Sequence, residues 1–258
     1  MGVVKYFALF PDGLQTGAKM AKILEIDHLP LHLHVALGVL ASELYAVADS
    51  EIPKIVRHVG GAALRRQGLS DDELREGMSK TAIACARASY ICSEVLNRCG
   101  FCASMVGVTM ESPRMFCSEH PGGRWISGGQ VVGTDQGWAG HAAVAVVFED
   151  GAFLFDPTIG CSRRDYLPSN WPDMLVARVG GDGALVERPW PDSDKLMHDP
   201  HIRYWSNPQW DADLKNARRL GLIFKDQWKR AIAVLTGKVR ASLAKMDGVT
   251  AAGINVPT

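Results

Sequence analysis

The sequence lacks an excess of charge of either sign. Its 258 residues include 28 basic and 28 acidic side chains, which cancel at neutral pH. A balanced chain has no global attraction to nucleic acid or to an anionic surface, so any specific chemistry must come from local sites. Because 47% of the residues are hydrophobic and 22% are charged, the chain can bury a substantial core.

Short motifs that mark common classes of site are also missing. No GxGxxG or GxxxxGK[ST] sequence occurs, which disfavours a parallel nucleotide-binding sheet. The six cysteines form no paired CxxC knuckles and have no zinc-type histidine spacing beside them, so a zinc ribbon is disfavoured. The chain has no internal repeat and no low-complexity segment. We therefore expect neither a metal nor a cofactor.

No segment is typical of export or of membrane insertion. The N-terminal apolar run is short, ends at Pro11 and lacks the charged start and cleavage site of a secretory signal. The longest apolar stretch, residues 29–48, contains His32, His34 and Glu43, which makes it too polar for a span of about 20 apolar residues. The cysteines are therefore interpreted as reduced thiols. We expect a cytoplasmic protein that makes no membrane contact.

Hydrophobic periodicity predicts the order of the elements. Apolar residues at helical spacing predict a core helix over Leu33 to Ala48, and a third helix follows a cap at Ser79 or Thr81 and ends near Gly100. A second, shorter helix is expected in residues 70–77. Strands are expected at 103–110, in the hairpin 140–160 and at 175–180, and a long loop with room for short strands is expected at 112–140. Residues 211–245 are again helical.

Helices followed by strands and a helical tail favour an α+β architecture, with an antiparallel sheet packed on a helix. We expect a single domain over residues 1–258. Within it, residues 1–78 form an N-terminal helical part, residues 79–180 form the core, and residues 181–258 form a loop-rich segment and a C-terminal helical tail.

The hairpin "GHAAVAVVFEDGAFLFDPTIG" places His141 at the start of one strand and Asp156 at the end of the next. If Asp150 and Gly151 form a two-residue turn, Asp156 lies opposite Ala145. His141 has the same parity as Ala145, so both polar side chains project from one face. This register separates them by four residues, about 13 Å at ~3.3 Å per residue, so a bulge or another turn is needed to join them.

An imidazole oriented by a carboxylate is the base half of a nucleophilic triad. A cysteine thiolate is favoured near a helix N-terminus and an imidazolium. Cys85 lies near the start of the third predicted helix, whereas Cys92 and Cys99 lie beyond the first turn, where the helix dipole fades. Cys85 is therefore the best candidate nucleophile.

At this point the chain resembles the transglutaminase-like superfamily of papain-like cysteine enzymes, which includes arylamine N-acetyltransferases. The similar segments are "CARASYICSEVLNRCGFCASMVGV", "GHAAVAVV" and "FLFDPTIG", within residues 81–160. The resemblance implies Cys85 as nucleophile, His141 as base and acid, and Asp156 as the residue that orients the imidazole. Trp138 and Gly140, just before His141, are placed at the substrate cleft.

The resemblance implies a covalent thioacyl intermediate formed from a peptide, protein or small amide substrate. The intermediate passes to water, as in a peptidase or amidase, or to an amine, as in an acyltransferase. Hydrolysis is preferred because no cofactor motif indicates an acyl carrier.

Other functions stay open at the level of sequence. The chain could be a noncatalytic binding or structural protein in which Cys85 is sealed from solvent and more than about 5 Å from His141. The basic residues of the C-terminal tail could bind nucleic acid or an acidic partner, although a solvated helix face is the commoner role. His32 and His34 diverge on a helix, which disfavours a metal site. Cys99 and Cys102 are interpreted as two separate thiols.

Overall fold

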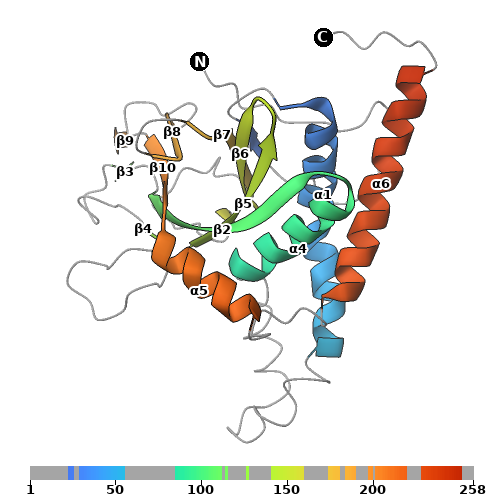
Figure 1. Ribbon diagram of the computed structural model, residues 1–258, viewed down its shortest axis with the longest axis horizontal. Helices are drawn as coiled ribbons and strands as arrows, with labels where there is room; N and C mark the ends of the chain where they lie inside the picture. The colour runs from blue at the N-terminus through green and yellow to red at the C-terminus, as the bar shows by residue number, and fades with distance from the viewer. Residues whose placement is uncertain are drawn as a thin grey trace, which may run out of the picture.

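The structure is a computed structural model (Figure 1). It describes residues 23–25, 29–55, 85–111, 114–115, 126–127, 141–159, 174–180, 184–189, 197–199, 201–219 and 228–251. The helix expected in residues 70–77, the caps Ser79 and Thr81, and both Trp138 and Gly140 lie outside these ranges.

Helices and strands are segregated along the described chain, which confirms the α+β prediction. The helices are α1 (Leu31–Ile55), α4 (Cys85–Arg98), α5 (Pro208–Arg219) and α6 (Lys229–Ala251). The strands are β1 (Ile23–Glu25), β2 (Cys102–Glu111), β3 (Arg114–Met115), β4 (Ile126–Ser127), β5 (His141–Phe148), β6 (Gly151–Asp156), β7 (Met174–Arg178), β8 (Val186–Pro189), β9 (Met197–Asp199) and β10 (His201–Ser206).

Among these strands, one sheet has the order β1-β7-β6-β5-β2-β10-β8, with β4 also paired to β2. Only the β1–β7 pair within the described sheet is parallel. β3 and β9 form a separate two-stranded sheet. The expected antiparallel sheet packed on a helix is therefore present, because α4 lies against β2 and β5 (Figure 1).

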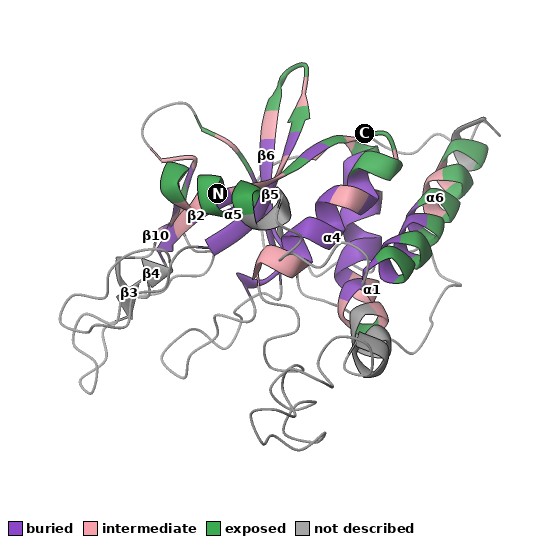
Figure 2. Cartoon of the chain, turned by 60° about the horizontal axis from the view of Figure 1, so that its bottom comes forward, coloured by how far each residue is buried: buried purple, intermediate pink, exposed green. Residues whose placement is uncertain are grey.

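The central strands are apolar on both faces because both faces are covered. One face packs against α1, α4 and α6 through residues that include Ala142, Val144 and Phe155. The opposite face has its own core, to which Ala143 and Leu154 belong. Figure 2 shows that the buried sides of α1, α4 and α6 meet one another, while the outer side of α6 is exposed.

Within the described residues, the C-terminal tail has two helices, α5 and α6. Trp228, just before α6, and Ile232 and Leu235 within it are buried in the core, whereas the lysines and arginines of α6 are exposed. Lys238 pairs with Glu43 of α1 at 2.9 Å. No described helix is long and apolar enough to cross a membrane.

The C-terminus of α4 has the glycine cap expected at Gly100. Gly100 has a φ of 94°, and its N–H donates to the Asn97 carbonyl at 3.1 Å. The next N–H, of Phe101, donates to the Leu96 carbonyl at 3.1 Å. This pair of bonds is the Schellman motif, which satisfies the last carbonyls of a helix and turns the chain into the next element. The cap directs the chain into β2, so α4 packs back on the sheet.

The hairpin register differs from the expected one. Phe148 pairs with Gly151 and Val144 with Phe155, so the two turn residues are Glu149 and Asp150. Gly151 has a φ of 145°, which favours glycine, and Arg178 lies beside it. Continuing this register places Asp156 level with Ala143, only two residues from His141 instead of four. The observed turn lies one residue earlier than the expected turn, so the residue opposite Asp156 changes from Ala145 to Ala143. Because this is a change of two positions, His141 and Asp156 still share one face of the sheet, as predicted. No bulge is needed to bring them together.

A close contact between β2 and α5 depends on glycine at position 107. A Cβ atom at Gly107 would lie 2.8 Å from both Asp211 Cα and the Trp210 carbonyl carbon. The Gly107 N–H also donates to Asp211 Oδ1 at 3.2 Å, and its carbonyl accepts from the Asn207 N–H at 3.0 Å. Backbone therefore lies directly on backbone, which only glycine allows.

Replacing Gly107 with alanine is expected to destabilise the protein by about 1–3 kcal/mol, because helix backbone must move to admit the methyl group. Urea unfolding of wild type and variant measures the difference. Gly237→Ala is the matched control, since no atom lies within 4 Å of its added Cβ. That change is expected to stabilise helix α6 by about 0.5–1 kcal/mol. Equal midpoints for Gly107→Ala and wild type would contradict the close packing.

Candidate active site

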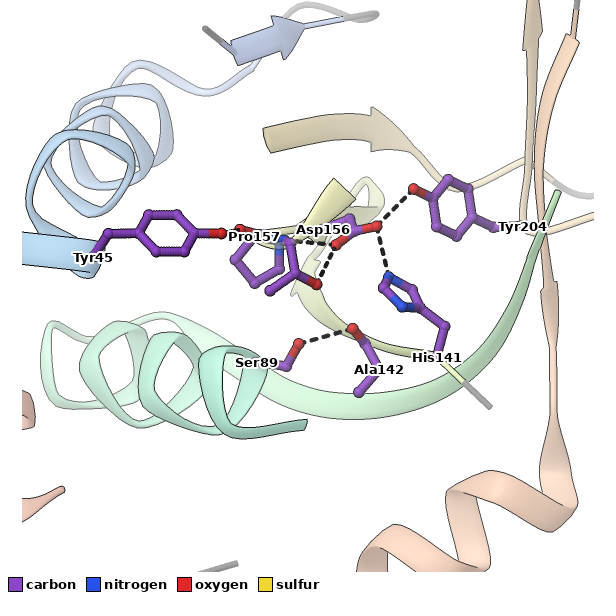
Figure 3. A network of polar contacts seen from close by, with 8 residues as sticks. Tyr45, Ser89, His141, Ala142, Asp156, Pro157 and Tyr204 are labelled. Atoms are coloured by element: carbon purple, nitrogen blue, oxygen red, sulfur yellow. Dashed lines mark hydrogen bonds and ion pairs between the residues drawn. The ribbon is translucent and has the colours of Figure 1, made fainter. Parts of the chain in front are cut away.

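His141 and Asp156 form a buried ion pair at the start of β5 and the end of β6. His141 Nε2 lies 2.7 Å from Asp156 Oδ2, and the two side chains are 5% and 0% exposed (Figure 3). Diagonal positions on neighbouring strands have Cα atoms about 7–8 Å apart, a gap that a histidine and an aspartate bridge together. The corrected hairpin register thus explains how the pair forms on a regular sheet.

The carboxylate of Asp156 accepts from four donors. Oδ2 accepts from the His141 ring and from the Tyr204 hydroxyl at 2.8 Å, and Oδ1 accepts from the Thr158 N–H at 2.8 Å and the Thr158 hydroxyl at 3.1 Å (Figure 3). An ionised carboxylate has about four acceptor positions. All of them are satisfied, which makes burial of this charge tolerable.

Cys85 is the first residue of α4, and the His141 side chain is near enough to its thiol to lower the pKa of that thiol. Because His141 Nε2 is engaged by Asp156, Nδ1 is the nitrogen left to face the sulfur. The thiol also contacts the backbone of Ala142, and Cys85 is only partly buried. The structure therefore brings Cys85, His141 and Asp156 together, and Cys85 is the least buried of the three residues.

A serine one helical turn after Cys85 ties α4 to the same strand. The Ser89 hydroxyl donates to the Ala142 carbonyl at 2.9 Å in a buried contact (Figure 3). Residues i and i+4 share one face of a helix, so Cys85 and Ser89 both face the start of β5. This contact sets the position of α4 along β5 and hence the approach of the thiol to the imidazole.

The charges of the three groups are coupled. Burial alone would raise the pKa of Asp156, but the His141 charge and the hydrogen bonds from His141, Thr158 and Tyr204 lower it overall. Burial alone would lower the pKa of His141, but the charge and hydrogen bond of Asp156, with a smaller contribution from Cys85, raise it to about 10. Near neutral pH the site holds an imidazolium beside a carboxylate.

The imidazolium in turn favours the thiolate of Cys85. Burial alone would raise the pKa of this thiol, but the hydrogen bond and charge of His141 and the Ala142 backbone lower it, against opposition from Asp156. Burial raises the pKa of Cys92 and of Cys99 instead. The four cysteines within the described ranges are free thiols, and Cys85 is the one that contacts the imidazole.

Tyr204 is a site residue that sequence reasoning missed. It lies on β10, in a segment expected to be loop-rich, where the structure instead has β8, β9 and β10. In "HIRYWS" the apolar residues Ile202 and Tyr204 stand two positions apart, and both are buried. This period-2 pattern is typical of a strand and was the available signal. Burial and the Asp156 carboxylate raise the pKa of Tyr204, so its phenol keeps the proton that it donates.

Replacing Tyr204 with phenylalanine is expected to destabilise the protein by about 1.5–3 kcal/mol at pH 7, because a hydrogen bond to a charged group is lost. The bond lowers the folded-state pKa of Asp156, so its contribution is present above the unfolded pKa of about 3.9 and is lost as pH falls through the folded value. Urea unfolding of both proteins at pH 7 measures the difference. Equal unfolding midpoints would show that the hydrogen bond from Tyr204 to Asp156 does not stabilise the fold.

The other groups singled out in the sequence have no described contact with this site. Trp138 and Gly140 fall in the part of the chain that is not described. His32 lies 3.1 Å from Asp247 of α6, at an exposed position. Within the described ranges, no group of three or more histidine, cysteine or acidic side chains is arranged to hold a metal ion.

Comparison of the chain with models of protein families, with curated proteins and with solved structures found no match.

Proposed function

We propose that this protein is a cysteine-dependent enzyme that acts on an amide or another acyl compound through a covalent thioacyl intermediate. Cys85 is the nucleophile, His141 is the general acid and base, and Asp156 holds the imidazole in position. The observation that carries the proposal is the placement of Cys85, at the start of α4, beside the buried His141–Asp156 pair, where the imidazole lowers the thiol pKa and the carboxylate raises the imidazole pKa.

In the first half of the proposed reaction, the Cys85 thiolate attacks the substrate carbonyl carbon and forms a tetrahedral intermediate. The imidazolium of His141 donates its proton to the departing amine, alcohol or thiol as the bond to the carbonyl carbon breaks. Asp156 stabilises the imidazolium before this transfer and fixes the ring so that Nδ1 faces the reacting atoms. The product of this half is an acyl group bonded to the sulfur.

In the second half, neutral His141 removes a proton from the acyl acceptor as that acceptor attacks the thioester carbonyl. The carbon–sulfur bond then breaks, and Cys85 leaves as a thiolate beside the newly formed imidazolium. Water as acceptor makes the protein a peptidase or amidase, which is our preference. An amine as acceptor makes it an acyltransferase. All proton transfers in this scheme use residues of the chain itself.

The resemblance to transglutaminase-like enzymes supports the same proposal. In that pattern a cysteine at the head of a helix faces a histidine and an aspartate on neighbouring antiparallel strands. Here those places belong to α4, β5 and β6, in that order along the chain. We further infer a reducing, cytoplasmic location, because Cys85 must remain a free thiol to act.

A catalytically inert binding or structural protein is the alternative. It predicts a nucleophile position that is sealed from solvent and far from the imidazole. Cys85 is instead only partly buried, and the nearby His141 side chain lowers the pKa of its thiol, which favours the enzyme.

Alkylation with iodoacetamide across pH, followed by mass spectrometry of the labelled peptides, tests the proposal. At pH 6 we expect Cys85 to react at least about tenfold faster than the exposed thiol of Cys102, because His141 lowers the pKa of Cys85 and the thiolate is the reactive form. His141→Ala should remove this advantage while leaving Cys102 unchanged. Slow labelling of both thiols in the wild type would overturn the proposal.

A further inference from the structure

A tyrosine on the N-terminal helix contacts the turn that carries Asp156. The hydroxyl of Tyr45, on α1, donates to the carbonyl of Pro157 at 2.8 Å, although the two residues are 112 positions apart (Figure 3). Pro157 directly follows Asp156. The contact therefore joins an element far away in the sequence to the aspartate's own turn.

The Pro157 carbonyl and the Thr158 N–H belong to one peptide group, which is planar. The Thr158 N–H donates to Asp156 Oδ1 at 2.8 Å. One edge of this peptide thus accepts from Tyr45 while its other edge donates to Asp156. Fixing the carbonyl fixes the direction of the N–H, and a hydrogen bond accepted by the carbonyl also polarises the group and strengthens the N–H as a donor.

We infer that Tyr45 is a positioning residue for Asp156, acting through the Pro157–Thr158 peptide. The inference rests on the proposed function, since it extends the series of contacts that runs from Asp156 through His141 to Cys85. Tyr204 holds Oδ2 from β10, and Tyr45 sets the donor to Oδ1 from α1. The carboxylate is therefore fixed from two different elements.

Helix α1 is anchored in the core near Tyr45. Its residues Leu37, Leu40 and Leu44 are fully or almost fully buried in the core that α4 and α6 share. The ion pair between Glu43 and Lys238 links the same turn of α1 to α6. Helix α1 thus contributes Tyr45 to the surroundings of Asp156 from a well-packed position.

Tyr45→Phe tests the inference, because it removes the hydroxyl and keeps the ring. We expect iodoacetamide labelling of Cys85 at pH 7 to slow by about two- to tenfold, and the pH midpoint of labelling to rise, because a less well-held carboxylate supports the imidazolium less. Glu43→Gln is the matched control, since it weakens the attachment of α1 to α6 without touching the peptide. This control should leave the labelling profile unchanged.

An unchanged labelling rate and midpoint in Tyr45→Phe would overturn the inference. An equal change in both variants would also overturn it, because general loosening of α1 would then be the cause. The pKa of the His141 ring can also be measured directly, by ¹⁵N NMR titration of the folded proteins. Tyr45→Phe should lower this pKa. If the labelling of wild-type Cys85 does not depend on His141, the proposed function fails. If it depends on His141 but is the same in Tyr45→Phe as in the wild type, only the inference about Tyr45 fails.

Discussion

Replacing Cys85 with serine is expected to lower turnover of an activated acyl substrate, such as a p-nitrophenyl ester, by about a thousandfold or more. Loss of the nucleophile from a triad costs rates of this order, because the remaining residues act only as a unit. A serine hydroxyl also stays protonated beside an imidazolium, whereas the thiol of Cys85 has a lowered pKa. Release of p-nitrophenol under steady-state conditions measures the loss.

The control for this variant is Cys102→Ser. Cys102 is exposed and pairs with Val147, whereas His141 pairs with Val108 six residues further along β2, about 20 Å away at ~3.3 Å per residue. The control should keep wild-type turnover. Full activity in Cys85→Ser would rule out the proposed nucleophile, and mass spectrometry of the wild type during turnover should show the acyl group on Cys85 alone.

Replacing Asp156 with asparagine is expected to lower kcat/KM by about 10³–10⁴-fold with little change in the shape of the site, the size of loss seen when a triad aspartate becomes neutral. The charge that raises the pKa of His141 to about 10 is removed, so the imidazolium loses its support near neutral pH. Wild-type activity should decline as pH rises through about 10, and in the variant this decline should begin at lower pH. A pH–rate profile of each protein measures the shift.

The same substitution has a pH-dependent effect on stability. The lowered pKa of Asp156 contributes stability above its unfolded pKa of about 3.9, and the raised pKa of His141 contributes fully below its unfolded pKa of about 6.5. The difference in unfolding free energy between wild type and Asp156→Asn should therefore be largest between these pH values. It should shrink as pH falls through the folded pKa of Asp156 or rises towards 10.

Asp150→Asn provides the matched control for charge. Asp150 lies in the exposed hairpin turn, where its side chain is 3.4 Å from Arg178, and its substitution removes the same charge from the same hairpin. The control should change neither the pH–rate profile nor the stability gap. If both variants behaved alike, net charge rather than the His141–Asp156 pair would explain the effect.

Some features of the site could be predicted because they depend on local sequence. The alternation of strand residues put His141 and Asp156 on one face whichever turn formed, so parity survived a wrong register. Helical periodicity and the Gly100 cap predicted α4 and, with it, Cys85 near the head of a helix. Side chains repeat their direction every two residues in a strand and about every 3.6 residues in a helix. This repeat is visible in the order of apolar and polar residues, so it can be found without the tertiary structure.

The register itself could not be predicted, because the choice between two adjacent turn positions depends on a distant strand. Arg178 of β7 donates to the Asp150 carbonyl and lies against Gly151, and these contacts accompany the turn at Glu149 and Asp150. One residue of difference on each strand halves the separation between His141 and Asp156. The predicted need for a bulge arose from that single error.

By itself, the sequence determined the α+β class, the helix that carries Cys85, and the shared face of His141 and Asp156, since each follows from periodicity and capping within one element. Only the tertiary structure decided which partners surround Asp156. Tyr204 of β10 and Tyr45 of α1 reach this turn from 48 and 112 residues away. Such contacts depend on how elements pack around a common core, and no local pattern encodes which tyrosine will arrive there.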